Sequence, residues 1–392
     1  MTDEGGGRRP GGTAPAPPPG PRERIGGLLD AGSFTELDRV ESGPGTAAVV
    51  GFGTIDGRDV ALYAIDLCAL SEAAAAKVVK TQDLALRSRI PLVGIHDSAS
   101  GHRPDDLTAL AGLAGVLQRH VLASGVIPRL GVVAGPPALD AVHPAALADF
   151  VLGGPHEVRD LLSYLPSHCG ESPPFLPTSD PTGRGDPELQ TIAPGGARRR
   201  AYDVREVVGR LLDDRRFLEV QAAHATSMVT GFGRLGGHVV GVVANQPAAG
   251  GGSIDGDGAA RAARLVRFCD AFAVPLVSVV DTPGSGAGPA RDHARLLSAY
   301  GEASVPRLVV IAGRASGDGY LLMSPRQMGA DLTLAWPEAE IAGGDPYAAA
   351  ERGYVDGVIE PRETRRALVR GLELCLRKTV ERPSRRHGST PV

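Results

Sequence analysis

Short apolar runs rich in valine, leucine and isoleucine recur along the chain, and most of them end at aspartate, serine or glycine. Between the runs lie alanine-rich stretches of helical character, such as SEAAAAKVVKTQDLAL and GAARAARLVRFCDAF. Short apolar runs bounded by turn residues are typical of buried strands. Strands that alternate with helices along the sequence predict an α/β protein with mainly parallel sheets.

The pattern occurs twice, in the same order, once in each half of the chain. Each copy has two valine-rich runs joined by DG or GG, which is typical of a β-hairpin. Each copy then has a strand that breaks at aspartate and a further strand that runs into glycine and small residues. The matching segments are 51–66 and 231–246, 90–101 and 274–286, and 127–141 and 305–319. The shared order indicates an internal duplication of one α/β unit.

Changes in composition mark where the two units begin and end. Residues 1–21 are rich in glycine and proline and have almost no large apolar side chains, so we expect a disordered tail. Residues 169–200 are dense in proline, glycine and serine and show no helical or alternating period, which predicts a linker. The expected domains are therefore 22–168 and 201–392.

Composition and charge narrow the function classes. Of the 392 residues, 42% are hydrophobic, enough for a sizeable core, and the net charge of −4 gives no reason to expect a nucleic-acid partner. No apolar stretch is long enough to span a bilayer and no signal-peptide pattern is present, so we expect a cytoplasmic protein without a membrane partner. The four cysteines are scattered without metal-ligand spacing, so we expect no metal site.

The strand ends carry the candidate chemistry. A strand that ends in small residues and leads into a helix leaves backbone N–H groups unpaired, and these suit an anion or a developing oxyanion. Because neighbouring parallel strands end at the same edge of a sheet, we expect two turns to meet there in each half. The candidate substrate-binding residues are Asp97, Ser98, Ala99, Ser100, Ala138, Gly284 and Gly317, and the candidate catalytic residues are Leu139, Asp140, Asp318, Gly319 and His96.

The aspartates that follow two of the turns, Asp140 and Asp318, have three interpretations. Each could cap a helix, act as an acid or base with a raised pKa, or be drift in an inactive relative. His96, His102 and His143 flank the N-terminal turns. His96 is the best candidate for catalysis among them, because it directly follows an apolar strand and precedes an aspartate.

Several segments resemble a known family. They are VVANQP (242–247), RLVRFCDAFAVPLVSVVDTPG (264–284), LLSAYGEASVPRLVVIAGRASGDGY (296–320), MGADLTLAWPEAEIA (328–342) and AAERGYVDGVIEPRETRRALVRGL (349–372), with RERIGGLLDAGSF (22–34), ASGVIPRLGVVAGPPALDAVHPAALADFV (123–151) and VRDLLSYLPS (158–167) in the first half. These segments closely resemble the carboxyltransferase (β) subunit of biotin-dependent acyl-CoA carboxylases of the propionyl-CoA and acetyl-CoA type.

The resemblance implies a fold and an assembly. It implies two tandem crotonase-like (ββα-spiral) domains, and an oligomer whose active site lies between the N-terminal domain of one subunit and the C-terminal domain of another. It further implies that the first domain holds an acyl-CoA thioester and the second holds carboxybiotin. Each ligand would lie beside a Gly-Gly pair whose backbone N–H groups form an oxyanion hole.

The chain departs from the family at these functional positions. The family motif GPCAGGA is GPPALDA here, so Leu139 and Asp140 replace the glycine pair, and KAYGGAY is RASGDGY, with Asp318 in place of glycine. Two segments that by the resemblance line the substrate canyon and help to build the subunit interface are absent, one after DFV and one after AEIAGGD. A carboxylate beside a developing enolate repels it, so unchanged carboxyl transfer is not expected.

We therefore expect biotin-independent decarboxylation of a β-carboxyacyl thioester through an enolate, in polyketide biosynthesis. The thioester would be carried by CoA or by an acyl carrier protein, no cofactor would be tightly bound, and the chain would form a homo-oligomer, dimer or larger. The alternative is a genuine biotin-dependent acyl-CoA carboxyltransferase, and only this alternative needs biotin. Further alternatives are a β-hydroxyacyl dehydratase and an inactive scaffold subunit. The sequence leaves open the acyl group, the carrier and the oligomer size.

Overall fold

The computed structural model describes residues 20–38, 48–66, 70–97, 107–134, 143–196, 199–381, 384, 388–389 and 391. The elements of the N-terminal half are α1 (Pro21–Leu28), β1 (Thr35–Leu37), β2 (Ala48–Ile55), β3 (Arg58–Asp66), α2 (Glu72–Ser88), β4 (Leu92–Asp97), α3 (Leu107–Ala123), β5 (Arg129–Ala134), α4 (His143–Ala146), β6 (Phe150–Leu152) and α5 (Pro155–Leu162).

The C-terminal half repeats this order and adds elements at its end. It contains α7 (Val204–Leu211), β7 (Phe217–Glu219), β8 (Met228–Leu235), β9 (His238–Asn245), α8 (Gly256–Ala271), β10 (Leu276–Thr282), α9 (Ala290–Glu302), β11 (Arg307–Ala315), α10 (Gly317–Leu322), β12 (Leu332–Ala335), β13 (Glu340–Ile341), α11 (Pro346–Glu351), β14 (Gly357–Val358) and α12 (Thr364–Cys375). Within the described ranges, none of the helices is both long and apolar enough to cross a membrane.

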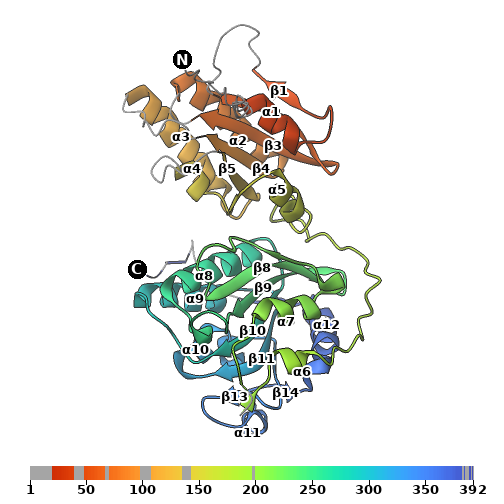
Figure 1. The fold of residues 1–392 in the computed structure, drawn as a ribbon. Coiled ribbons are helices and arrows are strands. Elements are labelled where there is room, and N and C mark those ends of the chain that lie inside the picture. Colours follow the sequence, from red (N-terminus) through yellow and green to blue (C-terminus); the bar gives the residue numbers. More distant parts are fainter. Residues whose placement is uncertain are drawn as a thin grey trace, which may run out of the picture.

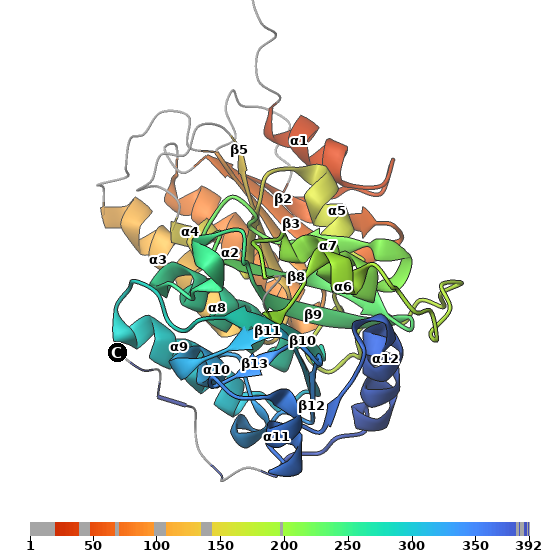
Figure 2. The same ribbon diagram turned by 60° about the horizontal axis from the view of Figure 1, so that its bottom comes forward.

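Each half contains one sheet, and the strand order of the first sheet recurs within the second, larger sheet. The first has the order β1-β2-β3-β4-β5-β6, and the second has the order β14-β12-β11-β10-β9-β8-β7, with β13 added beside β11. In both sheets the first three strands along the chain pair antiparallel and the later strands pair parallel. The internal repeat predicted from the sequence is therefore present in the backbone (Figures 1 and 2).

The predicted hairpins form because their turns contain residues that tolerate the left-handed region. Asp56 and Gly57 have φ values of 51° and 74°, and Gly236 and Gly237 have φ values of 61° and 85°. A two-residue hairpin turn of this kind needs positive φ at both central positions, which favours DG and GG. The hairpins β2-β3 and β8-β9 follow from this local chemistry.

A buried arginine at the start of the fifth strand of each repeat fixes that strand to the preceding helix. Arg129 donates from Nη1 to the carbonyl oxygen of His120 at the end of α3, at 2.6 Å. Arg307 donates in the same way to the carbonyl oxygen of Tyr300 in α9, at 2.5 Å. These bonds hold the amino ends of β5 and β11, and so set where their carboxyl ends lie.

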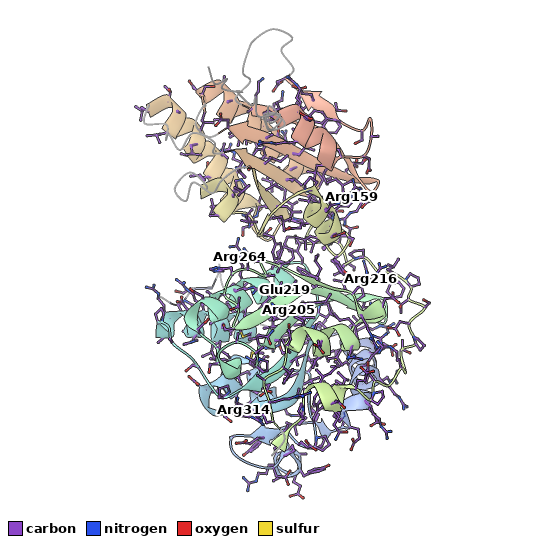
Figure 3. The ribbon with its side chains drawn as sticks, in the orientation of Figure 1. Arg159, Arg205, Arg216, Glu219, Arg264 and Arg314 are labelled. Atoms are coloured by element: carbon purple, nitrogen blue, oxygen red, sulfur yellow. The ribbon has the colours of Figure 1, made fainter. Side chains whose placement is uncertain are left out.

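The two halves pack against each other through apolar side chains. Phe150 of β6 lies edge-on to Phe268 of α8 and to Phe232 of β8, with ring centroids 4.8 and 5.7 Å apart. Arg264 of α8 donates to the carbonyl oxygens of Ala148 and Asp149, and Figure 3 shows it at the side of the C-terminal half that faces the N-terminal half. Buried aromatic pairs of this kind add to the stability of a packed interface.

The predicted linker is irregular apart from α6 (Leu189–Ile192), and it runs along the C-terminal half. The backbone N–H of Leu176 donates to the carbonyl oxygen of Gly237 at 3.0 Å. Further along, Asp186 is buried and pairs with Arg210 at 3.0 Å. These bonds attach the linker to the second repeat rather than leave it as a free tether. The predicted N-terminal tail, 1–21, lies outside the described residues except for 20 and 21.

Candidate active site

The carboxyl ends of β10 and β11 meet at one edge of the second sheet. The two strands run parallel, and Thr282 at the end of β10 pairs with Ala315 at the end of β11. The backbone N–H of Ser316 donates to the carbonyl oxygen of Thr282 at 3.2 Å. The turn after β10 and the turn after β11, which the sequence predicted to be neighbours, therefore lie in contact.

Glycines allow this close approach. Gly319 in the first turn of α10 is buried, and a Cβ atom there would lie 2.8 Å from Cγ2 of Thr282 and 2.9 Å from Cα of Gly284. Gly284 has a φ of 139° and Gly317 has a φ of 56°, values that residues with side chains rarely adopt. Three candidate residues of the C-terminal half thus shape the backbone where the two turns touch.

The carboxylate of Asp318 joins the two turns. The backbone N–H of Ser285 donates to Oδ1 of Asp318 at 2.8 Å, and the Ser285 hydroxyl donates to Oδ2. These hydrogen bonds hold the pKa of the Asp318 carboxyl below its usual range, because they stabilise the charged form. The expectation of an acid with a raised pKa is therefore wrong for Asp318, which carries its charge at neutral pH.

Asp318 is not the N-cap residue of α10. Ser316 occupies the N-cap position of α10 and makes no side-chain cap bond, while Asp318 lies inside the first turn of the helix. The backbone N–H of Asp318 itself also stabilises the carboxylate. A negative charge therefore lies among the first N–H groups of α10, where the family resemblance predicts an oxyanion hole.

Sequence reasoning placed Asp281 at a strand end but did not predict the side-chain hydrogen bonds that hold this edge in place. The carboxylate of Asp281 is 5% exposed and accepts the backbone N–H of Arg314 at 2.9 Å, while the N–H of Asp281 donates to Oδ1 of Asn245 at 3.2 Å. Arg314 also donates from Nη2 to the carbonyl oxygen of Gly251 at 3.0 Å (Figure 3). Asn245 ends the apolar run of β9. A polar residue directly after an apolar run is the sequence feature that could have identified it.

One histidine of the C-terminal half lies near Asp318. Nε2 of His293 in α9 lies 3.0 Å from the carbonyl oxygen of Ile254, and Ile254 bridges to Ser285. Attraction to His293 contributes to the lowered pKa of Asp318. No local sequence pattern pointed to His293, because α9 approaches the turn only when the sheet is assembled.

At the corresponding edge of the N-terminal half, the structure describes the ends of β4 and β5 but not the turns that follow them. Asp97 at the end of β4 pairs in register with Ala134 at the end of β5, so the strands end at one edge as predicted. Six of the predicted site residues lie outside the described ranges, namely Ser98, Ala99, Ser100, Ala138, Leu139 and Asp140. Their roles stay predictions, and so does the binding role of Asp97.

His96 lies in the core and not at an open site. It is 1% exposed, its Nε2 is 3.4 Å from the hydroxyl of Tyr63, and that hydroxyl is 2.8 Å from Nε2 of His120. Burial lowers the pKa of His96 to about 3, with a further contribution from His120. An enclosed, neutral imidazole does not reach a bound thioester, so this placement does not support the catalytic role expected for His96.

The described residues contain no candidate metal centre. Among them, no group of three or more histidine, cysteine, aspartate and glutamate side chains could hold a metal ion. The described edge offers backbone N–H groups, the carboxylates of Asp318 and Asp281, the hydroxyls of Ser285 and Thr282, and the side chains of Arg314 and His293.

Known proteins resemble this chain along nearly its whole length. The carboxyl transferase domain family matches residues 20–153, 152–343 and 344–390. The biotin-dependent acetyl-/propionyl-coenzyme A carboxylase beta5 subunit of Mycobacterium tuberculosis is 35% identical, covering 95% of this chain and 89% of that protein. The methylmalonyl-CoA decarboxylase subunit alpha of Veillonella parvula is 34% identical, covering 95% of this chain and 92% of that protein.

A solved structure of transcarboxylase 12S, described as a hexamer with methylmalonyl-coenzyme A and methylmalonic acid bound, has a TM-score of 0.87. It is 31% identical and covers 95% of this chain and 92% of its own. The predicted fold of two tandem crotonase-like domains and the predicted resemblance to carboxylase β-subunits are confirmed. The alignment with the M. tuberculosis protein runs over 491 positions, more than the 392 residues here, so that protein has segments without a counterpart in this chain. The chain belongs to the carboxyl transferase domain family of enzymes.

Proposed function

We propose that this chain moves a carboxyl group to or from the α-carbon of a short acyl-CoA thioester. The observation that carries the proposal is the 35% identity, over 95% of the chain, with a subunit named for acetyl-/propionyl-CoA carboxylation. The methylmalonyl-CoA bound to transcarboxylase 12S supports a substrate of the propionyl or methylmalonyl class. The names of these relatives refer to coenzyme A thioesters, so we propose that the acyl group is carried by CoA and not by an acyl carrier protein.

The names of the relatives give more support to the biotin-dependent alternative than to decarboxylation without biotin. When bound, carboxybiotin would supply the carboxyl group. The family resemblance would place biotin at the turn of Gly317 and Asp318. The ionised carboxylate of Asp318 lies in that turn, and it would repel a ligand oxygen that gains negative charge. The residues of this turn do not fit such a ligand, and no step through biotin follows from them.

The Asp318 carboxylate favours a second candidate, decarboxylation of a β-carboxyacyl-CoA without biotin. In this reaction the bond between the α-carbon and the carboxylate carbon breaks and CO2 leaves. The bonding electron pair moves to the α-carbon and the thioester oxygen as an enolate, and a proton from water then adds to the α-carbon. We propose that backbone N–H groups at Leu139 and Asp140 hold the enolate oxygen, as an oxyanion hole does.

A relative also supports a proposal about the oligomeric assembly of this chain. Transcarboxylase 12S is described as a hexamer. We propose that this chain also forms a homo-oligomer in which the N-terminal half of one subunit faces the C-terminal half of another. The Asp318 edge would then lie opposite the thioester bound by the neighbouring subunit.

One experiment tests the proposal and separates its two versions. The purified chain is incubated with methylmalonyl-CoA labelled with 13C in its free carboxylate, with and without avidin to sequester biotin, and in parallel with propionyl-CoA and carboxybiotin. Loss of the label from methylmalonyl-CoA with avidin present supports the biotin-independent version. Conversion of propionyl-CoA to methylmalonyl-CoA by carboxybiotin, with no loss of label when avidin is present, supports the biotin-dependent version. No change in any thioester under either condition overturns the proposed function.

A further inference from the structure

A groove with a volume of about 400 Å³ lies between the two halves of the chain. One wall comes from the N-terminal half, at the end of α3, the start of β5 and α4, and the other wall comes from α8 and α9 of the C-terminal half. Figure 2 shows α3 and α4 beside α8. Sites that bind small organic molecules have volumes of about 300–1,000 Å³, so this groove is large enough for such a ligand.

The charge of the groove has one sign. Among the described residues that line it, every charged side chain is an arginine, namely Arg129 of β5, Arg264 and Arg267 of α8, and Arg295 of α9. We call this site the arginine groove. Arg267 pairs with Glu302 at 2.9 Å and Arg295 pairs with Asp292 at 3.0 Å, and neither carboxylate belongs to the lining of the groove.

The positive charge of Arg264 is not matched by an ion pair. Its guanidinium donates to the carbonyl oxygens of Ala148 and Asp149, and within the described ranges it forms no ion pair. Burial lowers the pKa of Arg264, and repulsion from Arg129 lowers it further, against the attraction of Asp149. Two guanidinium groups are therefore held near each other in the groove, and an anion bound there would offset their repulsion.

A second arginine of the groove has a donor to spare. The Nε atom of Arg295 is buried and has no hydrogen-bond partner among the described residues. A buried donor without a partner costs free energy, and buried polar groups in proteins are almost always hydrogen-bonded. An oxygen atom of a ligand at this wall would supply the missing partner.

The arginine groove is separate from the edge where the thioester is expected. Arg129 begins β5, whereas the turn predicted to hold the thioester follows Ala134 at the other end of this strand. Six residues of strand span about 17 Å. A ligand in the arginine groove would therefore contact both halves of the chain away from the reacting thioester.

We infer that the arginine groove binds a small organic phosphate of the nucleoside phosphate class, which thereby links the two halves of the chain. A phosphate group accepts paired hydrogen bonds from guanidinium groups. The apolar side chains of Leu147, Ala260 and Ala263 line the same groove and provide a surface for the nucleobase, and a guanidinium plane stacks on an aromatic ring. The inference does not depend on the reaction proposed above.

Binding measurements on the full chain test the inference. The protein is titrated by calorimetry with AMP, with adenosine and with inorganic phosphate. We expect AMP to bind at least about tenfold more tightly than either of its parts, because only AMP engages both the arginines and the apolar wall. Saturating carboxymethyl-CoA, an inert thioether, should leave the affinity for AMP unchanged. Equal affinities for AMP and adenosine, or displacement of AMP by carboxymethyl-CoA, would overturn the inference.

Variants locate the binding, and thermal unfolding shows that each variant is folded. Arg264→Gln and Arg267→Gln should each weaken AMP binding about tenfold or more, because each loses charged hydrogen bonds to the phosphate. Arg291→Gln removes an arginine of α9 that does not line the groove, so it is the matched control.

A charge placed in the groove gives a test that leaves the arginines intact. Ala260→Glu adds a carboxylate to the wall and should abolish AMP binding by repulsion, whereas Ala260→Gln adds the same bulk without charge and should weaken binding much less. If the two Ala260 variants bind AMP equally, or if Arg291→Gln weakens binding as much as Arg264→Gln does, the arginine groove is not the binding site.

Discussion

The carboxylate of Asp318 accepts both the backbone N–H and the hydroxyl of Ser285, and so ties the turn after β11 to the turn after β10. A family glycine would leave this position without charge, whereas here the first turn of α10 carries a carboxylate with a lowered pKa. The same contact thus orders the edge and changes the electrostatics of the site that the family resemblance predicts there.

Replacing Asp318 should change the balance between the two proposed reactions. In Asp318→Gly the carboxylate and its repulsion are gone, so carboxyl transfer from carboxybiotin should rise relative to biotin-independent decarboxylation. The ratio of the two rates, measured with labelled methylmalonyl-CoA and propionyl-CoA, checks this. Asp318→Asn, which keeps the size of the side chain but loses its charge, should change the ratio in the same direction, and an unchanged ratio in both variants would contradict the electrostatic argument.

Gly319→Ala should destabilise the protein and abolish its activity. The new Cβ atom would lie 2.8 Å from Thr282 and 2.9 Å from Cα of Gly284, so the two turns must separate. Overpacking of this kind costs about 1–3 kcal/mol in free energy of unfolding, which urea titration measures. Gly301→Ala in α9 is the matched control, because a Cβ there has nothing within 4 Å. Equal stability of both variants would show that the turns are not in contact.

The buried pair His96 and His120 should make the fold sensitive to acid. Burial lowers the pKa of His96 to about 3 and that of His120 to about 4. In the unfolded chain each has an ordinary pKa of about 6.5 and binds a proton that the folded state does not. The free energy of unfolding should therefore fall as the pH drops from about 6.5 towards 4, by up to about 1.4 kcal/mol per pH unit for each histidine.

Denaturant titrations at several pH values check this slope. His96→Val should make the slope shallower, and the second repeat shows that valine fits, since Val280 occupies the matching place in β10. His156→Ala removes an exposed histidine and serves as the control. A slope that is the same in His96→Val and in the unchanged protein would mean that His96 is not buried as a neutral group.

The buried arginines should be equivalent in the two repeats. Arg307→Met removes the buried guanidinium hydrogen bonds to the carbonyl oxygens of Tyr300 and Gly329. A hydrogen bond from a charged group contributes about 1.5–3 kcal/mol, so the loss of several such bonds should lower the free energy of unfolding by about 3 kcal/mol or more. Arg129→Met should cost a similar amount, since it also removes the ion pair with Asp149. Thermal unfolding measures both. Arg366→Met on the exposed side of α12 should have little effect, and a loss for only one of the buried arginines would argue against equivalent roles.

Much of the fold was readable from local patterns, for physical reasons. The DG and GG turns force their hairpins, because Asp56, Gly57 and the Gly236–Gly237 pair tolerate positive φ. Apolar runs that end at Asp97 and Asp281 predicted buried strands, and β4 ends at Asp97 while β10 ends one residue after Asp281, at Thr282. The repeated order of segments predicted two copies of one sheet, because the same local sequence favours the same local structure.

The roles of individual side chains were decided by the tertiary structure. His96 and Asp318 both looked like catalytic groups from their places after strands, yet one packs against Tyr63 in the core and the other bonds to Ser285 at an edge. Which face of a strand a side chain takes, and which loop meets it, depend on contacts between residues far apart in sequence. Strands and turns follow from neighbours along the chain, whereas burial, charge state and partners follow from neighbours in space.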